Sequence, residues 1–398
     1  MTSDGTRTRR AAIAGIHEFE PRSAPGTSAL QIKAACAARA LDDAGLTWSD
    51  VDAVYDAGEG GAGAVLSIAE YLGIEPALVD TTGVGGSSFE FHAAHAAGAV
   101  AAGRARVALL TYGSTAHSDR RAIGTGARGG PPTAAGNMEA PYGLTLVGNY
   151  AMVARRHMHQ YGTAPEQLAE IAVTTRAHAM RNPAAVRGLA DLGRKDVHEI
   201  GVGDVLASRM IADPLHLLEC CIISDGGGAV VIVAPEVARD TRTRPVWILG
   251  AGEAVGYQHH GGDLTVTAAA RSGPPAFGQA GVRPDEMDVA MIYDSFTITV
   301  LAILEDLGFC AKGEGGAYVE GGRLRFDRPG APALNTDGGG LASNHPGMRG
   351  IFLLIEAARQ LRGESTAQVE GARLAVAHGN GGQLGTRHAA ATIVLGRD

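Results

Sequence analysis

Apolar positions along the chain fall into two recurring patterns, short runs of strand length and longer stretches with helical spacing. Residues 11–16, 51–55 and 106–112 are short apolar runs that predict buried strands. Residues 28–44 and 89–102 instead have a helical periodicity. Strands and helices that alternate at these lengths are typical of an α/β fold with crossover connections.

A polar segment interrupts this alternation. Residues 117–142 are rich in Gly, Pro, Ser and Arg, which predicts an extended surface loop, and long loops of this kind are usually functional or mobile. Residues 144–156 and 165–180 have helical patterns, whereas residues 182–209 are mixed and polar. We therefore interpret residues 117–209 as a loop lobe inserted into the first half of the chain.

The second half of the chain repeats the first. Residues 40–56 (ALDDAGLTWSDVDAVYD) parallel residues 276–294 (AFGQAGVRPDEMDVAMIYD), with Ala-Gly and Asp at one constant offset and Tyr-Asp after a two-residue slip. This repeat predicts a duplicated fold with a pseudo-twofold axis and two halves, residues 1–240 and 241–398. Because ligands in open α/β sheets bind beyond the carboxyl ends of the strands, both halves are expected to face one central site.

Composition and charge narrow the class of protein. Of the 398 residues, 45% are hydrophobic and 19% are charged, which excludes wholesale disorder. The net charge of −8, without a block of like charges, argues against nucleic acid as a partner. No apolar stretch approaches the roughly 20 residues of a membrane span, so we expect a cytoplasmic protein. Cysteine usage agrees with a reducing compartment, because no disulfide framework and no CxxC pair is formed by Cys36, Cys220, Cys221 and Cys310.

A glycine-rich turn at residues 334–350 (LNTDGGGLASNHPGMRG) is the first candidate site. It presents Asn344 and His345 just before residues 351–363, which have the pattern of an amphipathic helix. Glycine lets a backbone approach a ligand closely, and a helix N-terminus offers unpaired N–H groups. The alternative interpretation is a tight turn that contains a histidine without using it.

Three further segments are expected at the same place. Residues 293–296 (YDSF) and 378–382 (HGNGG) come at the ends of predicted strands, and residues 85–88 (GGSS) precede a long alanine-rich helix. In a duplicated α/β fold these ends converge, so the four segments predict one central site.

This order of motifs resembles the thiolase superfamily, specifically its sterol-carrier-protein-type branch. The resemblance covers nearly the whole chain, including the duplication, the loop lobe and the ISDGGGAVVIV segment at residues 223–233. It implies a thiolase-like α/β fold in which two βαβ-type halves stack as αβαβα layers. It also implies a homodimer that acts on acyl-CoA, and a small OB-fold acyl-CoA-binding protein as a further partner. No cofactor is expected beyond the CoA of the substrate, and no metal ion.

The departures from the family are informative. The position of the acylated cysteine in thiolases falls on Gly86 here, and the second, acid/base cysteine position is matched by His378. The histidine of the Gly-His-Pro motif is matched by His345, and Tyr293 stands at the Asn of the Asn-Glu-Ala-Phe motif. A tyrosine there is similar to the thiolase-like aldolases that shorten steroid side chains and cleave a β-hydroxyacyl-CoA without an acyl-cysteine.

The resemblance and the chemistry together imply roles for these residues. Retro-aldol cleavage needs a base for the β-hydroxyl group, donors for the enolate oxygen and an acid for carbon. Tyr293 and His378 are the acid/base candidates in either order, and His345 is an expected oxyanion donor. Because tyrosine has a reference pKa of about 10, a nearby cation would have to activate Tyr293 as a base. Five residues are expected to bind substrate or stabilise the oxyanion: Gly86, Ser87, Asn344, Gly381 and Gly382.

Three functions remain open. The leading hypothesis is retro-aldol cleavage of a β-hydroxyacyl-CoA, with a steroid, terpenoid or other lipid acyl group. The second is acyl transfer through Ser87, Ser88 or a group from a partner, although the more ordinary role of these serines is to cap the following helix. The third is a non-catalytic subunit that binds acyl-CoA or lipid, in which Tyr293 and His378 would be ordinary core residues.

Overall fold

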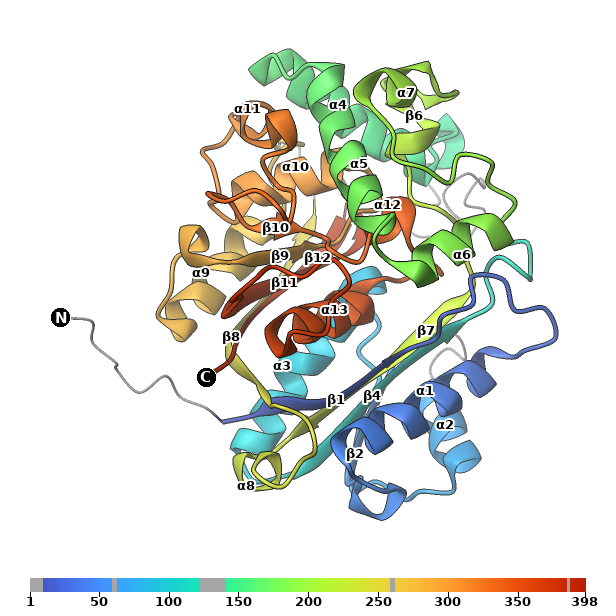
Figure 1. Cartoon of the computed structure of the whole chain (residues 1–398), viewed down its shortest axis with the longest axis vertical. Helices are drawn as coiled ribbons and strands as arrows, with labels where there is room; N and C mark the ends of the chain where they lie inside the picture. Colours follow the sequence, from blue (N-terminus) through green and yellow to red (C-terminus); the bar gives the residue numbers. More distant parts are fainter. Residues whose placement is uncertain (1–9, 59–62, 122–139, 258–261, 385–386) are drawn as a thin grey trace.

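The computed structural model describes residues 10–58, 63–121, 140–257, 262–384 and 387–398 (Figure 1). Its main sheet has ten strands in the order β10-β9-β11-β12-β8-β1-β7-β4-β2-β3. The strands of the first half are β1 (Ala12–Glu18), β2 (Ala53–Asp56), β3 (Leu78–Asp80), β4 (Val107–Ser114) and β7 (Gly226–Val233). Those of the second half are β8 (Val246–Tyr257), β9 (Val289–Ile292), β10 (Ala333–Leu334), β11 (Leu374–Gln383) and β12 (Arg387–Gly396).

The two halves have the same topology. In the first, β2 is parallel to β3 and β4, and β7 is antiparallel to β4 and β1. In the second, β9 is parallel to β10 and β11, and β12 is antiparallel to β11 and β8. The halves join where β1 pairs with β8 through only two residue pairs. This repetition confirms the predicted duplicated α/β fold.

Two helices lie between the half-sheets and four cover the outer faces (Figure 1). The central helices are α3 (Ser88–Ala101) and α13 (Gly350–Arg362), which contact each other and strands of both halves. The outer helices are α1 (Ala29–Ala44) and α2 (Ala64–Leu72) on one side, and α9 (Ala269–Ala280) and α10 (Thr297–Asp306) on the other. The layers therefore stack as αβαβα.

Local signals explain where the outer helices begin and end. Ser28 and Gln31 form a capping box at the start of α1, because each side chain accepts a hydrogen bond from the backbone of the other. Gly45 after α1 and Gly281 after α9 both adopt left-handed backbone angles, with φ of 76° and 64°. These equivalent glycines are the ones that the sequence repeat aligned.

The lobe packs against α10, α11 (Gly315–Val319) and α12 (Gly339–Ala342) at the upper end of Figure 1. The expected mixed segment at 182–209 contains two helices, and the first begins with Asn182 as cap and Pro183 at its first position. Residues 122–139 of the expected surface loop lie outside the described residues. The predicted lobe, residues 117–209, contains α4 (Leu146–Tyr161), α5 (Pro165–Ala179), α6 (Pro183–Asp191) and α7 (Val202–Ala207). The short strands β5 (Met210–Ala212) and β6 (Leu215–His216) follow it directly.

The predicted boundary at residue 240 lies between α8 (Pro235–Ala238) and β8. In the part of the chain that the structure describes, the second half repeats the strand order of the first but has no inserted lobe of comparable length. Within the described ranges, every helix is too short or too polar to cross a membrane.

Candidate active site

The space beside Gly86 is occupied by an aromatic ring. Gly86 lies in a short turn, Gly85–Ser87, that leads into α3. A Cβ atom at Gly86 would stand within 3.0 Å of Cε2, Cζ and Oη of Tyr293, closer than real Cβ atoms approach. A cysteine side chain at position 86 is therefore sterically incompatible with the observed position of Tyr293.

Tyr293 forms a pair with His345. The tyrosine directly follows β9, and its hydroxyl group lies 3.0 Å from Nε2 of His345. The two rings meet edge to face, with centroids 5.6 Å apart, and each residue is only 4% exposed. The fold thus joins two predicted site residues that are 52 positions apart in sequence.

Both members of this pair are neutral. Burial, followed by the nearby Cys221 thiol and the Tyr150 hydroxyl, raises the pKa of Tyr293 well above 10. Burial and the Arg349 guanidinium lower the pKa of His345 to about 4. Nδ1 of His345 has no partner among the described residues. Among the described residues, none of the groups that most affect the pKa of Tyr293 is a cation, so the phenol is protonated and can donate a proton at neutral pH.

Arg349 holds the two loops that carry the pair. Its Nη2 atom donates to both carboxylate oxygens of Asp337, at 2.7 and 2.6 Å, and its Nε lies 3.1 Å from Asp294. Its Nη1 atom donates to Oδ1 of Asn344 at 2.5 Å. Asp294 follows Tyr293 and Asn344 precedes His345, so one fully buried guanidinium fixes both neighbours.

The structure uses Asn344 to support its loop. Its amide nitrogen donates to Glu18 at 2.7 Å, and its amide oxygen accepts from Arg349. Asn344 was expected to bind substrate, and the structure instead places its side chain between these two charged groups.

The His345 loop is also held from the first half. The hydroxyl group of Tyr112 on β4 donates to the Pro346 carbonyl at 2.7 Å and accepts from the Met348 amide at 3.0 Å. The backbone N–H of His345 donates to the Ser224 hydroxyl at 3.0 Å. The loop is thereby fixed to both β4 and the segment that precedes β7.

The structure does not bring His378 to the pair. Strand β11 was expected to end near His378, but it continues to Gln383, so successive side chains still alternate between its two faces. Nδ1 of His378 lies 2.8 Å from the Thr392 hydroxyl, which in turn bonds Ser272 of α9 at 2.9 Å. His378 therefore faces the outer helices, and burial lowers its pKa to about 3.

The glycines that follow His378 face the turn before α3. A Cβ atom at Gly381 would collide with the Val84 carbonyl, and one at Gly85 would stand 2.8 Å from the Gly382 nitrogen. Only glycine allows this close approach, and Gly382 also has a φ of 82°. The fold thus brings together the predicted Gly86, Gly381 and Gly382.

The two serines brace this turn. Ser87 donates through Oγ to the Ala389 carbonyl at 3.1 Å. Ser88 donates to the Gly85 carbonyl at 2.6 Å and accepts from the Val84 amide at 3.0 Å. Both hydroxyl groups are therefore engaged within the protein, and neither makes the expected capping bond to α3.

Sequence reasoning missed Tyr150 and the position of Cys221. The Tyr150 ring lies 4.5 Å from that of Phe296, and its hydroxyl accepts from Asn380 at 3.1 Å. The backbone N–H of Cys221 donates to the Ser295 carbonyl at 2.9 Å, and burial raises the pKa of its thiol. A protonated thiol is a poor nucleophile. No local signal marks either residue, because the lobe and the segment before β7 reach the site only through the fold.

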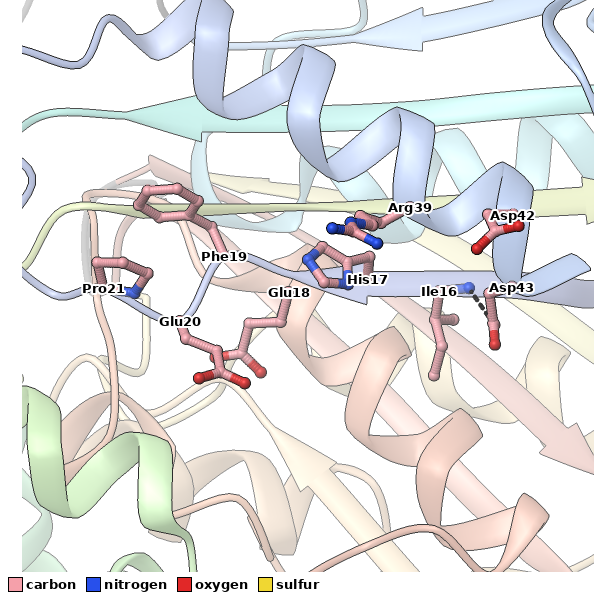
Figure 2. Close-up of a pocket in the computed structure, with 9 residues that line it drawn as sticks. All are labelled: Ile16, His17, Glu18, Phe19, Glu20, Pro21, Arg39, Asp42 and Asp43. Carbon is pink, nitrogen blue, oxygen red and sulfur yellow. Dashed lines mark hydrogen bonds between the residues drawn. The ribbon is translucent and has the colours of Figure 1, made fainter.

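A surface pocket lies elsewhere, between β1 and α1 (Figure 2). His17 and Arg39 line it together with Glu18, Asp42 and Asp43. Tyr293 and His345 do not line this pocket, although Glu18 also accepts a hydrogen bond from Asn344 through its carboxylate. Across the described ranges, no group of three His, Cys, Asp or Glu side chains is arranged to hold a metal ion.

The similarity to known proteins, in sequence and in structure, covers both halves of the chain. Residues 251–397 match the family described as Thiolase C-terminal domain-like. The chain is 36% identical over 377 residues to the steroid side-chain-cleaving aldolase of Thermomonospora curvata, which covers 90% of this chain and 92% of that protein. It is 35% identical over 367 residues to an acetyl-CoA acetyltransferase of Methanothermobacter thermautotrophicus, which covers 87% of this chain and 90% of that protein.

A solved structure agrees with these relatives. The protein named Ltp2-ChsH2(DUF35) aldolase superposes with a TM-score of 0.86 and 33% identity, and the match covers 99% of each chain. The similarity in sequence and the duplicated sheet thus lead to the same family. The chain belongs to the thiolase superfamily, in its sterol-carrier-protein-type branch.

Proposed function

We propose that this protein cleaves a carbon–carbon bond of a β-hydroxyacyl-CoA by a retro-aldol reaction. The observation that carries the proposal is the Tyr293 ring beside Gly86, where a nucleophilic side chain would stand, with His345 as its hydrogen-bond partner. A reaction that transfers an acyl group needs a nucleophile to carry it, whereas retro-aldol cleavage needs only proton transfers and oxyanion stabilisation. The 36% identical aldolase of Thermomonospora curvata supports the same reaction.

The neutral pair suggests how the reaction begins. The β-hydroxyl group of the substrate donates its proton to the Tyr293 oxygen while the phenol passes its own proton to Nε2 of His345. The carbon–carbon bond then breaks, a ketone or aldehyde forms, and the bonding electrons move into a thioester enolate. Backbone N–H groups near Gly381 and Gly382 are the proposed donors to the enolate oxygen. Burial lowers the pKa of His345 to about 4, so its imidazole is unprotonated at neutral pH and Nε2 has a lone pair that can receive the phenol proton.

The names of the relatives also suggest a substrate class and a partner. We propose a bulky acyl group of the steroid or terpenoid type, because the aldolase relative is named for steroid side chains. The solved aldolase is named for two components, which supports a small partner protein for this chain as well. A homodimer remains a proposal from the family resemblance, and a cytoplasmic location remains a proposal from the cysteine usage and apolar pattern of the sequence.

Replacement of Tyr293 tests the reaction. Tyr293→Phe keeps the ring beside Gly86 and removes the hydroxyl group, so we expect cleavage of a steroid β-hydroxyacyl-CoA to fall about 10²–10⁴-fold. Chromatography of the carbonyl product and the shortened acyl-CoA measures the rate. Tyr71→Phe, on the exposed face of α2, is the control and should retain wild-type cleavage.

The acetyltransferase relative supports acyl transfer as a second candidate function. Incubation with radiolabelled acyl-CoA followed by denaturation separates the two reactions. Covalent label on the protein would contradict the aldolase proposal and support acyl transfer. If Tyr293→Phe and His345→Ala both left turnover unchanged, a binding role without catalysis would replace both proposals.

A further inference from the structure

The central helix α3 contains an acidic residue that the reaction described above does not use. Glu90 is fully buried, and neither carboxyl oxygen has a hydrogen-bond partner among the described residues. Buried polar groups are nearly always satisfied, because an unsatisfied one destabilises the fold. An isolated carboxyl group in the centre of the molecule therefore requires a functional explanation.

The Glu90 carboxyl group occupies side-chain space that two glycines leave empty. A Cβ atom at Gly379 would stand within 3.0 Å of Oε2 and Cδ of Glu90 and of Cα of Ser87. A Cβ atom at Gly350 would stand within 3.0 Å of the same Oε2 and of the Gly86 carbonyl oxygen. The carboxyl group thus lies between β11, α13 and the turn that contains Gly86.

Glu90 and Tyr293 reach this turn from opposite directions. Glu90 is four residues after Gly86 on α3, and helical side chains lean toward the N-terminus, which places its carboxyl group back over that turn. Tyr293 fills the space beside Gly86 from β9, and Glu90 is one of the groups that influence its pKa. Two proton-bearing groups therefore flank the same short segment.

Retro-aldol cleavage requires two such groups, because the β-hydroxyl group must lose a proton and the α-carbon must gain one. His378 was the expected second group, but its side chain faces α9. Gly379, the next residue, faces α3, and the space of its missing side chain holds the Glu90 carboxyl group. We propose that Glu90 is the general acid that protonates the α-carbon of the thioester enolate, an inference that rests on the proposed retro-aldol function.

The proton balance closes without a further reactant. The β-hydroxyl proton moves to the Tyr293–His345 pair, and the bonding electrons move into the enolate as the carbonyl product forms. The Glu90 carboxyl proton then forms the new C–H bond, which leaves a carboxylate. That carboxylate recovers its proton from the Tyr293–His345 pair. Burial raises the pKa of Glu90 well above its ordinary value, which favours the protonated acid that this step needs.

Hydrogen exchange at the α-carbon measures this step apart from bond cleavage. Wild-type protein and propionyl-CoA are incubated in D₂O, and mass spectrometry follows deuterium uptake at the α-carbon. We expect Glu90→Gln, which keeps the shape but has no acidic proton, to reduce exchange at least about 100-fold. Tyr293→Phe should slow cleavage much more than exchange. Glu70→Gln, on the exposed face of α2, is the control and should match the wild type.

The outcomes separate the two proposals. If Glu90→Gln exchanged at the wild-type rate, the proposed role of Glu90 would be overturned and the aldolase proposal would stand. Failure of the wild-type protein to exchange would also overturn the proposed role of Glu90. Exchange that depends on Glu90, without cleavage of any β-hydroxyacyl-CoA, would overturn the aldolase proposal and support Glu90 as an acid.

A spectroscopic measurement keeps the inference testable if Glu90→Gln does not fold. Infrared spectra of wild-type protein at about pH 8.5 should retain a protonated-carboxyl band. Burial gives Glu356 and Asp294 pKa values of about 7 and 6, so both are ionised at that pH. Absence of the band would overturn the inference, and a shift of its frequency in Glu90→Asp, which moves the carboxyl group to different neighbours, would support it.

Discussion

Two glycines shape the site through the side chains that occupy their empty space. Tyr293 fills the space beside Gly86, and Glu90 fills the space beside Gly379. Gly86 falls at the position of the acylated cysteine in thiolases, and Gly379 directly follows His378, which falls at the position of the second cysteine. Phenol and carboxyl groups carry protons but are weaker nucleophiles than a thiolate, so this exchange of side chains favours proton transfer over acyl transfer.

The packing at Gly86 is directly testable. We predict that Gly86→Ala displaces Tyr293, because the added methyl group would overlap its ring, and lowers stability by about 1–3 kcal/mol. Cleavage should fall at least about tenfold. Denaturant unfolding and product chromatography measure the two effects.

Gly98→Ala is the matched control. This glycine also lies on α3, but it is exposed and a Cβ atom there meets no other atom within 4 Å. Its replacement should raise helix stability by up to about 1 kcal/mol. Wild-type cleavage in Gly86→Ala would contradict the proposed position of Tyr293 in catalysis.

At the scale of elements, the loop between β10 and α13 is held by charge. Arg349 is fully buried and contacts Asp294, Asp337 and Asn344, which come from two separate segments. Burial raises the pKa of Asp294 to about 6, against the opposing effect of the Arg349 charge. The loop therefore depends on one guanidinium that compensates two buried carboxyl groups.

Removal of that guanidinium should be costly. We predict that Arg349→Met lowers the free energy of unfolding by about 3–5 kcal/mol, because it leaves Asp294 and Asp337 buried without a cation. Urea denaturation at neutral pH measures the change. Arg283→Ala removes an exposed arginine that pairs with Asp285, and it should leave stability unchanged. Equal stability of the two variants would show that the buried network does not support the fold.

At the scale of the whole molecule, the two halves use equivalent aspartates at the start of equivalent strands. Asp52 accepts hydrogen bonds from the backbone amides of Arg106 and Val107, at 2.8 and 3.0 Å. Asp288 accepts from the backbone amides of Arg373 and Leu374, at 2.7 and 2.9 Å. Asp52 thus connects the start of β2 to the start of β4, and Asp288 connects the start of β9 to the start of β11 in the same way.

This symmetry predicts matched and independent effects. Asp52→Ala and Asp288→Ala should each lower the free energy of unfolding by about 1–2 kcal/mol, because each leaves two backbone donors without an acceptor. The double variant should show the sum within about 0.5 kcal/mol, since the sites share no contacts. Asp→Asn variants keep one acceptor oxygen and should lose less stability. A strongly non-additive double variant would contradict independence of the halves.

Much of this architecture was predictable from local signals. Ser28 and Gly45 mark the ends of α1, and the repeat in sequence aligns Gly45 with Gly281 and Asp52 with Asp288. Capping and turn residues act within a few positions of the chain, so they can be recognised without knowledge of the fold. The helix at Pro183–Asp191 was missed because its polar composition hid the signal of Asn182 followed by Pro183.

The sequence by itself determined the α/β class, the duplication, the glycine at position 86 and the motifs that carry Tyr293 and His345. Only the tertiary structure decided which other groups face them. His378 and Gly379 are adjacent, yet the continued pairing of β11 with β12 turns one to the outer helices and the other to α3. A shift of one residue in a strand reverses every side chain, and the register is set by neighbouring strands that are distant in sequence. For the same reason, the place of Glu90 beside Gly379 depends on the packing of α3 against β11.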